Sequence, residues 1–158
     1  MKKKGFTLVE LLAVIAILAI LVIVAMPNVL GMFNQAKSST FVTEVQTYLD
    51  VAKTNYVANA LESTGGMTFY HETATPTLFS GETENKLDMD GADKSYKIVI
   101  SAAGKITSVI IWDGNFCYSK TGTDITKDQV SKNDLRLGAA TKTGDSATVG
   151  CNGAAVTE

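Results

Sequence analysis

The sequence predicts an α+β fold in which a long N-terminal α-helix, with a transmembrane half and an amphipathic half, packs on a small antiparallel β-sheet. Residues 6–26 are almost entirely apolar, residues 41–60 repeat apolar side chains at helical spacing, and residues 96–119 hold three β-prone runs separated by turns. We therefore divide the chain into a basic N-terminal segment, a membrane helix, an amphipathic helical half and an exposed globular head: 1–5, 6–27, 28–61 and 62–158.

The composition is that of an ordinary globular protein: 158 residues, 46% hydrophobic, 19% charged and a net charge of −2. These averages exclude a disordered, collagen-like or disulfide-dense chain, and they lack the basic excess expected of a nucleic-acid-binding protein. The distribution is uneven, however. Three lysines precede the apolar block, whereas the chain after Pro27 carries 11 basic and 15 acidic residues.

The apolar block begins at Phe6 and ends at Met26, and only Thr7 and Glu10 interrupt it. As a helix, its 21 residues span roughly 31 Å, close to the hydrocarbon thickness of a bilayer. The lysines before it place the N-terminus in the cytoplasm and the C-terminal domain outside. The block is too long for a cleaved secretory signal peptide. A plain signal anchor fits its length but leaves Glu10 unexplained, because a carboxylate in lipid is costly.

Residues 4–12, Lys-Gly-Phe-Thr-Leu-Val-Glu-Leu-Leu, resemble the leader and mature N-terminus of type IV prepilins and pseudopilins. The resemblance covers residues 2–30 and includes a proline, Pro27, where many pilins carry a helix-kinking proline. It implies the pilin fold and a structural subunit of a type IV pilus, a filament used in adhesion and motility. It implies no enzymatic activity and no cofactor.

The resemblance also implies a role for individual residues. Prepilin peptidase would cleave the leader 1–5 between Gly5 and Phe6, Phe6 would become the N-methylated N-terminus, and Glu10 would serve assembly. Electrostatics support the assembly role of Glu10, because the new α-amino group of Phe6 is mostly positive at neutral pH. Pairing of Glu10 with the Phe6 amine of a neighbouring subunit would offset the cost of burying both charges. A chance carboxylate at the end of a simple anchor remains the alternative.

Partners and location follow from the same resemblance. They are a helical homo-oligomeric filament, prepilin peptidase, the pilus assembly machinery of the membrane, and membrane lipid before assembly, with no sign of nucleic acid. The precursor would lie in the cytoplasmic membrane as a single-pass protein with its N-terminus inside, and the assembled subunit would lie in an extracellular filament. Two alternatives stay open: a pseudopilin of a type II secretion or competence system, and a single-span membrane-anchored extracellular binding domain.

The helical pattern continues beyond the membrane block. Apolar residues recur at steps of three and four: Phe41, Val45, Leu49, Ala52, Tyr56 and Ala60. This predicts an amphipathic helix over 28–61 whose apolar stripe faces the head through ordinary core packing rather than a ligand site. Pro27 lacks an amide donor and clashes with the preceding turn, so we expect a kink or local break there.

The head is predicted to be an antiparallel meander. Residues 62–95 are rich in Gly, Thr and Ser and indicate a connector with at most short elements. Strands are expected at 96–100, 106–112 and 116–119, with turns at 103–105 and 113–115. Thr126 could cap a short helix over 126–130, and the tail from Leu137 is expected to be irregular.

The two cysteines are Cys117 and Cys151. An even count in an exported domain suggests one disulfide, which would close a loop of about 35 residues. Many type IV pilins staple their C-terminal region in this way, so the resemblance implies the same bridge. Two independent buried thiols are the alternative.

The remaining candidates for chemistry are weak. Asp88, Asp90 and Asp93 surround a glycine and form a weak Ca²⁺ candidate, but a solvated turn is the preferred interpretation because no EF-hand spacing follows. His71 is the only histidine and is expected to be solvated in the connector. No catalytic arrangement and no metal site are expected.

Overall fold

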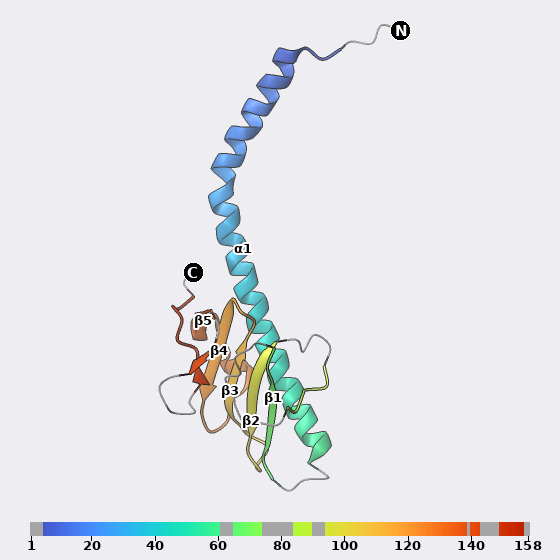
Figure 1. Ribbon diagram of the computed structural model, residues 1–158, viewed down its shortest axis with the longest axis vertical. Helices are drawn as coiled ribbons and strands as arrows, with labels where there is room; N and C mark the ends of the chain where they lie inside the picture. Colours follow the sequence, from blue (N-terminus) through green and yellow to red (C-terminus); the bar gives the residue numbers. More distant parts are fainter. Residues whose placement is uncertain are drawn as a thin grey trace. The chain divides into compact units, whose positions relative to one another are not determined.

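A computed structural model of the chain describes residues 5–60, 65–73, 84–89, 94–138, 140–142 and 149–156. The chain divides into two compact units, Met1–Lys37 and Ser38–Glu158. One long helix and seven short strands follow each other along it (Figure 1): α1 (Leu8–Asn59), β1 (Met67–His71), β2 (Ser95–Ile100), β3 (Ile106–Trp112), β4 (Phe116–Thr121), β5 (Leu135–Leu137), β6 (Thr141–Lys142) and β7 (Val149–Gly150).

Helix α1 accounts for both predicted helical halves. It begins at Leu8, ends at Asn59 and carries Pro27 inside it without a break in the helical assignment. The kink that Pro27 is expected to cause stays a prediction. Within the first unit every described side chain is exposed, whereas buried positions begin at Ser38.

The sheet of the second unit has five antiparallel strands in the order β1-β2-β3-β4-β5. Strands β2, β3 and β4 confirm the predicted meander, and each differs from its expected range by no more than two residues at either end. The expected connector, residues 62–95, contains a strand of the main sheet. Strand β1 pairs with β2 along its whole length, from Met67 opposite Ile100 to His71 opposite Tyr96. A strand of this length gains its stability from its neighbour, which local composition does not reveal.

The apolar stripe of α1 packs on one face of the sheet, as predicted. Phe41, Val45, Leu49 and Ala52 are at most 1% exposed. They form one core with the inward residues of β2 and β3, among them Ile98 and Ile111. Figure 1 shows the strands lying beside this C-terminal part of the helix. Polar contacts reinforce the packing: Lys127 Nζ lies 2.8 Å from Asp50 Oδ2.

A register shift in β3 keeps its apolar residues on the helix side. Ile106 pairs with Ile100, but Ser108 pairs with Val99, so the strands slip by one residue between these pairs. In a regular strand Ile106 and Val109 would point to opposite faces, since side chains alternate. The bulge lets both enter the same core, where each is at most 1% exposed.

The other face of the sheet carries a second, smaller cluster: Tyr70, Ile110, Trp112, Cys117 and Ala140, with Val149 and Cys151 packed against it. The structure joins Cys117 and Cys151 in a disulfide with a Cα–Cα distance of 5.6 Å, as predicted. The bridge therefore holds the C-terminal segment over the outer face of the sheet.

The C-terminal region is more ordered than the expected irregular tail. Strand β5 ends at Leu137, and β6 pairs with β7. The Leu137 amide donates to the Ala154 carbonyl at 2.9 Å, which covers the free edge of β5. Gly153 permits this approach, because a Cβ there would lie 1.6 Å from the Leu137 oxygen. The predicted helix near Thr126 is only a 3₁₀ turn, Lys127–Gln129, and the Thr126 side chain makes no capping bond.

Candidate functional site

The residues singled out at the N-terminus lie just before α1. Gly5, Phe6 and Thr7 are exposed and outside the helix, and the Phe6 side chain is 79% exposed. A Cβ added to Gly5 would meet no atom within 4 Å. The peptide bond between Gly5 and Phe6 is therefore accessible, and nothing among the described residues requires a glycine at position 5.

Thr7 and Glu10 form a reciprocal cap at the start of the helix. The Thr7 backbone amide and its hydroxyl both donate to Glu10 Oε2 at 2.8 Å, and the Glu10 amide donates to Thr7 Oγ1 at 3.3 Å. This is a capping box, in which two amide groups left free by the first helical turn find partners. The sequence contains the signature of this cap, a threonine followed three residues later by glutamate before an apolar run, whereas only an intermolecular role was expected for Glu10.

The cap leaves Glu10 able to bind a second group. Both Thr7 bonds end on Oε2, whereas a carboxylate offers about four lone-pair positions on two oxygens. Thr7 also lies after the Gly5–Phe6 bond, so removal of residues 1–5 would leave the cap in place.

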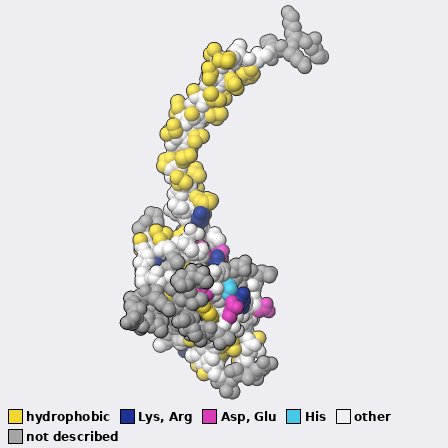
Figure 2. Space-filling view, viewed as in Figure 1, with side chains coloured by type: hydrophobic (Ala, Val, Ile, Leu, Met, Phe, Trp, Pro, Cys, Tyr) yellow, Lys and Arg dark blue, Asp and Glu magenta, His cyan; other side chains and the backbone are white. Residues whose placement is uncertain are grey.

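The surface beyond the cap is apolar. Figure 2 shows hydrophobic side chains along the first part of α1, and large residues there, such as Leu8, Ile23 and Met32, are between 71 and 74% exposed. Helix α1 is long and apolar enough to cross a membrane, judged by length and composition. The described residues leave this surface exposed.

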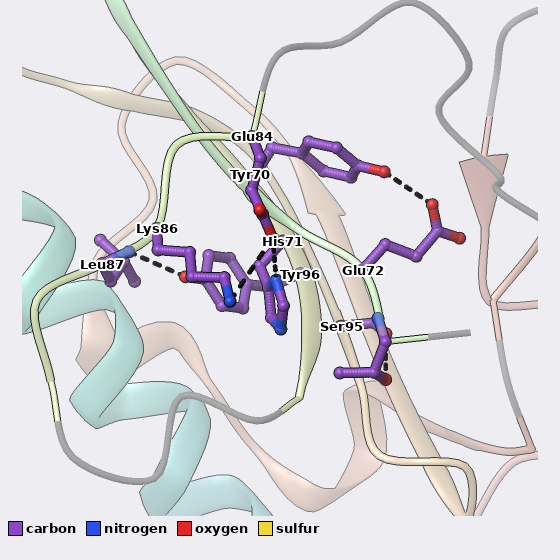
Figure 3. A network of polar contacts seen from close by, with 9 residues as sticks. Tyr70, His71, Glu72, Glu84, Lys86, Leu87, Ser95 and Tyr96 are labelled. Carbon is purple, nitrogen blue, oxygen red and sulfur yellow. Dashed lines mark hydrogen bonds and ion pairs between the residues drawn. The ribbon is translucent and has the colours of Figure 1, made fainter. Parts of the chain in front are cut away.

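The only histidine is not solvated, contrary to expectation. His71 lies in β1, is 9% exposed, and its Nδ1 is 2.5 Å from Glu84 Oε1. Figure 3 shows this pair beside Tyr96, whose hydroxyl accepts the Leu87 amide at 2.8 Å. The hydrogen bond with His71 holds the pKa of the Glu84 carboxyl below its usual value, against a smaller opposing effect of desolvation. The strand pairing of β1, which the sequence analysis missed, is what brings His71 into this position.

These contacts tie the segment 84–89 to the sheet. The backbones of Tyr70 and Asn85 exchange two hydrogen bonds of 2.8 and 3.0 Å, and the Leu87 side chain is 3% exposed in the main core. The cluster is accounted for by packing and by fixing this segment. Its role is therefore structural.

The structure describes one of the three aspartates of the Ca²⁺ candidate. Asp88 is exposed, whereas Asp90 and Asp93 lie outside the described residues. Among the described residues no group of three His, Cys, Asp or Glu side chains is placed to hold a metal ion.

A comparison with protein families agrees with the N-terminal geometry. A profile described as the prokaryotic N-terminal methylation motif matches residues 1–26. No curated protein and no solved structure gives a significant match to the chain. The matched segment contains the Gly5–Phe6 bond, the Thr7–Glu10 cap and the apolar turns of α1. The chain therefore carries the N-terminal methylation motif ahead of a long helix and a five-stranded antiparallel sheet, an arrangement that is type IV pilin-like.

Proposed function

We propose that the protein is a structural pilin, cleaved by prepilin peptidase between Gly5 and Phe6 and polymerised into a cell-surface type IV filament that serves adhesion or motility. The observation that carries the proposal is the match of residues 1–26 to the methylation motif, on a segment whose candidate scissile bond is exposed and precedes a capped apolar helix.

The proposed cleavage is supported by the position of the bond. A peptidase acts on an accessible, non-helical peptide, and residues 5–7 have both properties. Cleavage would remove the three lysines and leave Phe6 as the new N-terminus, with its α-amino group two residues before the first helical residue, Leu8. Methylation of that amine keeps its positive charge.

The proposed assembly role of Glu10 is supported by electrostatics. In the low dielectric of a membrane or a filament core, the unpaired carboxylate and the unpaired amine would each be costly. The Phe6 amine of a neighbouring subunit can approach the Glu10 oxygen that Thr7 leaves unoccupied. One ion pair then offsets two burial costs.

The exposed apolar turns of α1 support two successive locations. In the precursor they lie in the cytoplasmic membrane, with the lysines inside and the head outside. In the filament they pack against copies of themselves, so the apolar surface stays out of water in both states.

Processing is tested by replacing Gly5 with valine in cells that contain the peptidase, and by measuring the mass of the N-terminal peptide. We expect the wild type to begin with methylated Phe6 and the Gly5→Val variant to retain residues 1–5. Gly31→Val is the matched control, since an added Cβ meets no atom within 4 Å there either. A Gly5→Val variant processed as fully as the wild type would contradict the proposed bond, and an intact Met1 in the wild type would favour a plain membrane anchor.

Assembly is tested by Glu10→Gln. Glutamine keeps the oxygen that accepts the Thr7 bonds but removes the charge, because a capping box accepts either residue. We expect normal cleavage with a loss of surface filaments, measured by mass spectrometry and by the amount of sheared filament. Thr7→Ala is the control that removes the two hydroxyl bonds of the cap and keeps the charge. Normal filament abundance for Glu10→Gln would disprove the pairing.

The motif and the geometry of residues 5–10 fit a pseudopilin as well as a pilin, so they do not distinguish the two functions. Electron microscopy of the cell surface separates the two functions. Long exposed fibres that contain this chain support a pilin, whereas processed protein without such fibres supports a pseudopilin.

A further inference from the structure

The character of α1 changes at Met26. Between Leu11 and Met26 the helix is apolar on all sides, whereas in residues 26–37 polar side chains and a glycine occupy much of one side. At 100° per residue, Met26, Leu30, Phe33 and Lys37 fall on one face, and Asn28, Gly31 and Gln35 fall on the opposite face. Met26, Leu30 and Phe33 are 56–58% exposed, so neighbouring described residues of the helix leave this face uncovered.

Lys37 lies at the C-terminal end of this face. Lys37 Nζ lies 4.6 Å from the centre of the Phe33 ring, and Lys37 is exposed. Lys37 is also the first basic residue after Lys4, so 32 residues without Lys or Arg precede it. An exposed ammonium group on a long aliphatic stem, at the end of such a run, is typical of the point where a helix leaves the hydrocarbon and enters the headgroups.

The length of the helix agrees with this position. The rise from Leu8 to Lys37 is roughly 44 Å, whereas a bilayer measures about 40–45 Å with its headgroups and about 30 Å without them. With Glu10 at the inner boundary of the hydrocarbon, a layer of about 30 Å extends from Leu11 to about Gly31, so Phe33 lies near the outer boundary and the Lys37 side chain can reach the headgroups.

We propose that the face formed by Met26, Leu30, Phe33 and Lys37 is a lipid-binding surface of the precursor, at which the Lys37 ammonium binds the phosphate of an anionic phospholipid. Phe33 lies at the boundary between acyl chains and headgroups. The proposal rests on the membrane-anchored precursor of the proposed function and adds the lipid class and the residues that bind it.

Charge complementarity favours lipid over a second copy of this segment. Within the described residues of the first unit, the only carboxylate is that of Glu10, at the far end of the helix. A second copy of residues 26–37 would therefore offer Lys37 no counter-charge, whereas an anionic headgroup supplies one at the correct depth.

The test uses the full-length precursor in vesicles and an indole as depth reporter. Phe33→Trp is introduced together with Trp112→Phe, which removes the only native tryptophan. The vesicles contain phosphatidylcholine and phosphatidylglycerol in fixed proportion, and acyl chains brominated near the headgroup are carried by one lipid or the other. A second reporter, Gln35→Trp in the same background, samples the polar face.

We expect the indole at position 33 to be quenched more strongly than the one at position 35. Brominated phosphatidylglycerol should be enriched around it about five-fold over brominated phosphatidylcholine, the factor that one lysine contributes near an anionic surface. Lys37→Gln should abolish this preference. Lys53→Gln, a control on the same helix outside residues 26–37, should keep it.

Three results would overturn the proposal. Equal quenching by the two lipids would remove the headgroup preference, and unquenched emission typical of water would place the face in solvent. Emission typical of an apolar site without quenching would mean that a second copy of the chain covers the face. None of these results changes the N-terminal mass after peptidase treatment, so the proposed processing is tested separately.

Discussion

The two parts of α1, Leu8–Lys37 and Ser38–Asn59, share one backbone conformation and have opposite surfaces. In the first part Ile17 is 59% exposed and lies among other apolar residues, whereas in the second part Val45 is fully buried and lies on a narrow stripe. The second part finds its partner within the chain, in the five-stranded sheet. The first part is exposed throughout its described residues.

The difference shows what a folding core requires. Burial of an apolar stripe stabilises a unit when the same chain supplies the opposing surface, as strands β1–β4 do for residues 41–52. The exposed part, Leu8–Lys37, buries no such stripe, and under the proposed function lipid or other subunits cover it. Substitutions in the two parts should therefore separate folding from membrane insertion and assembly.

The largest effect is expected from a core truncation paired with its exposed counterpart. Ile111, fully buried in β3, should cost about 2–5 kcal/mol of unfolding free energy when replaced by alanine. Ile17→Ala should change the stability of the head by less than about 0.5 kcal/mol. Urea denaturation of the full chain in detergent, followed by Trp112 fluorescence, measures both. Similar losses for the two variants would contradict the division between the buried core of the head and the exposed part of α1.

The second-largest effect is expected from removal of the disulfide. Replacing Cys117 and Cys151 together by alanine should cost about 3–4 kcal/mol, because the bridge closes a loop of about 35 residues in the unfolded chain. The C-terminal segment should leave the outer face of the sheet, so the emission of Trp112, now 4% exposed, should shift to the red. The reduced wild type is the control. The main core contains neither cysteine, so complete loss of near-ultraviolet ellipticity would contradict this separation.

Two buried tyrosines give a smaller, matched comparison inside the head. Tyr96 and Tyr118 are both fully buried, but only the Tyr96 hydroxyl has a partner among the described residues, the Leu87 amide. Tyr96→Phe should therefore cost about 1–3 kcal/mol by leaving that amide unpaired. Tyr118→Phe should be neutral or stabilise by up to about 1 kcal/mol. Thermal unfolding of both variants checks the sign, and a loss for Tyr118→Phe would reveal an unseen partner.

The smallest effect is expected on the pH dependence of stability. The hydrogen bond with His71 lowers the pKa of Glu84 from its ordinary value of 4.5, so its contribution to stability is present above that value and is lost as pH falls through the lowered pKa. Glu84→Gln should make the melting temperature fall less steeply between about pH 5 and pH 3 than in the wild type. Asp88→Asn, which changes an exposed carboxylate of the same segment, is the control. Identical pH profiles for Glu84→Gln and the wild type would contradict a role for this pair.

Several elements were predictable because their signals are local. The apolar stripe of α1, the turns after Ile100 and Trp112, and the three strands around them follow from side-chain period and turn residues. Strand β1 and the short strands near the C-terminus were not predictable in the same way. Met67–His71 lies among glycines and threonines, and its extended conformation depends on pairing with β2.

The candidate site shows the same division. Gly5, Phe6 and Glu10 were recognisable because they form a short contiguous motif, and the Thr7–Glu10 cap could have been recognised from its spacing. The environment of His71 could not, because Glu84 lies 13 residues away and reaches it across an intervening segment.

By itself, the sequence determined the apolar helix, the motif before it, the meander and the even pair of cysteines, since each depends on neighbouring residues or on helical and strand periods. Only the tertiary structure decided that β1 completes one edge of the sheet, that His71 is buried beside Glu84, and that the disulfide and Gly153 hold the C-terminal segment over the outer face and along β5. These features depend on contacts between residues far apart in the chain, which no local pattern encodes.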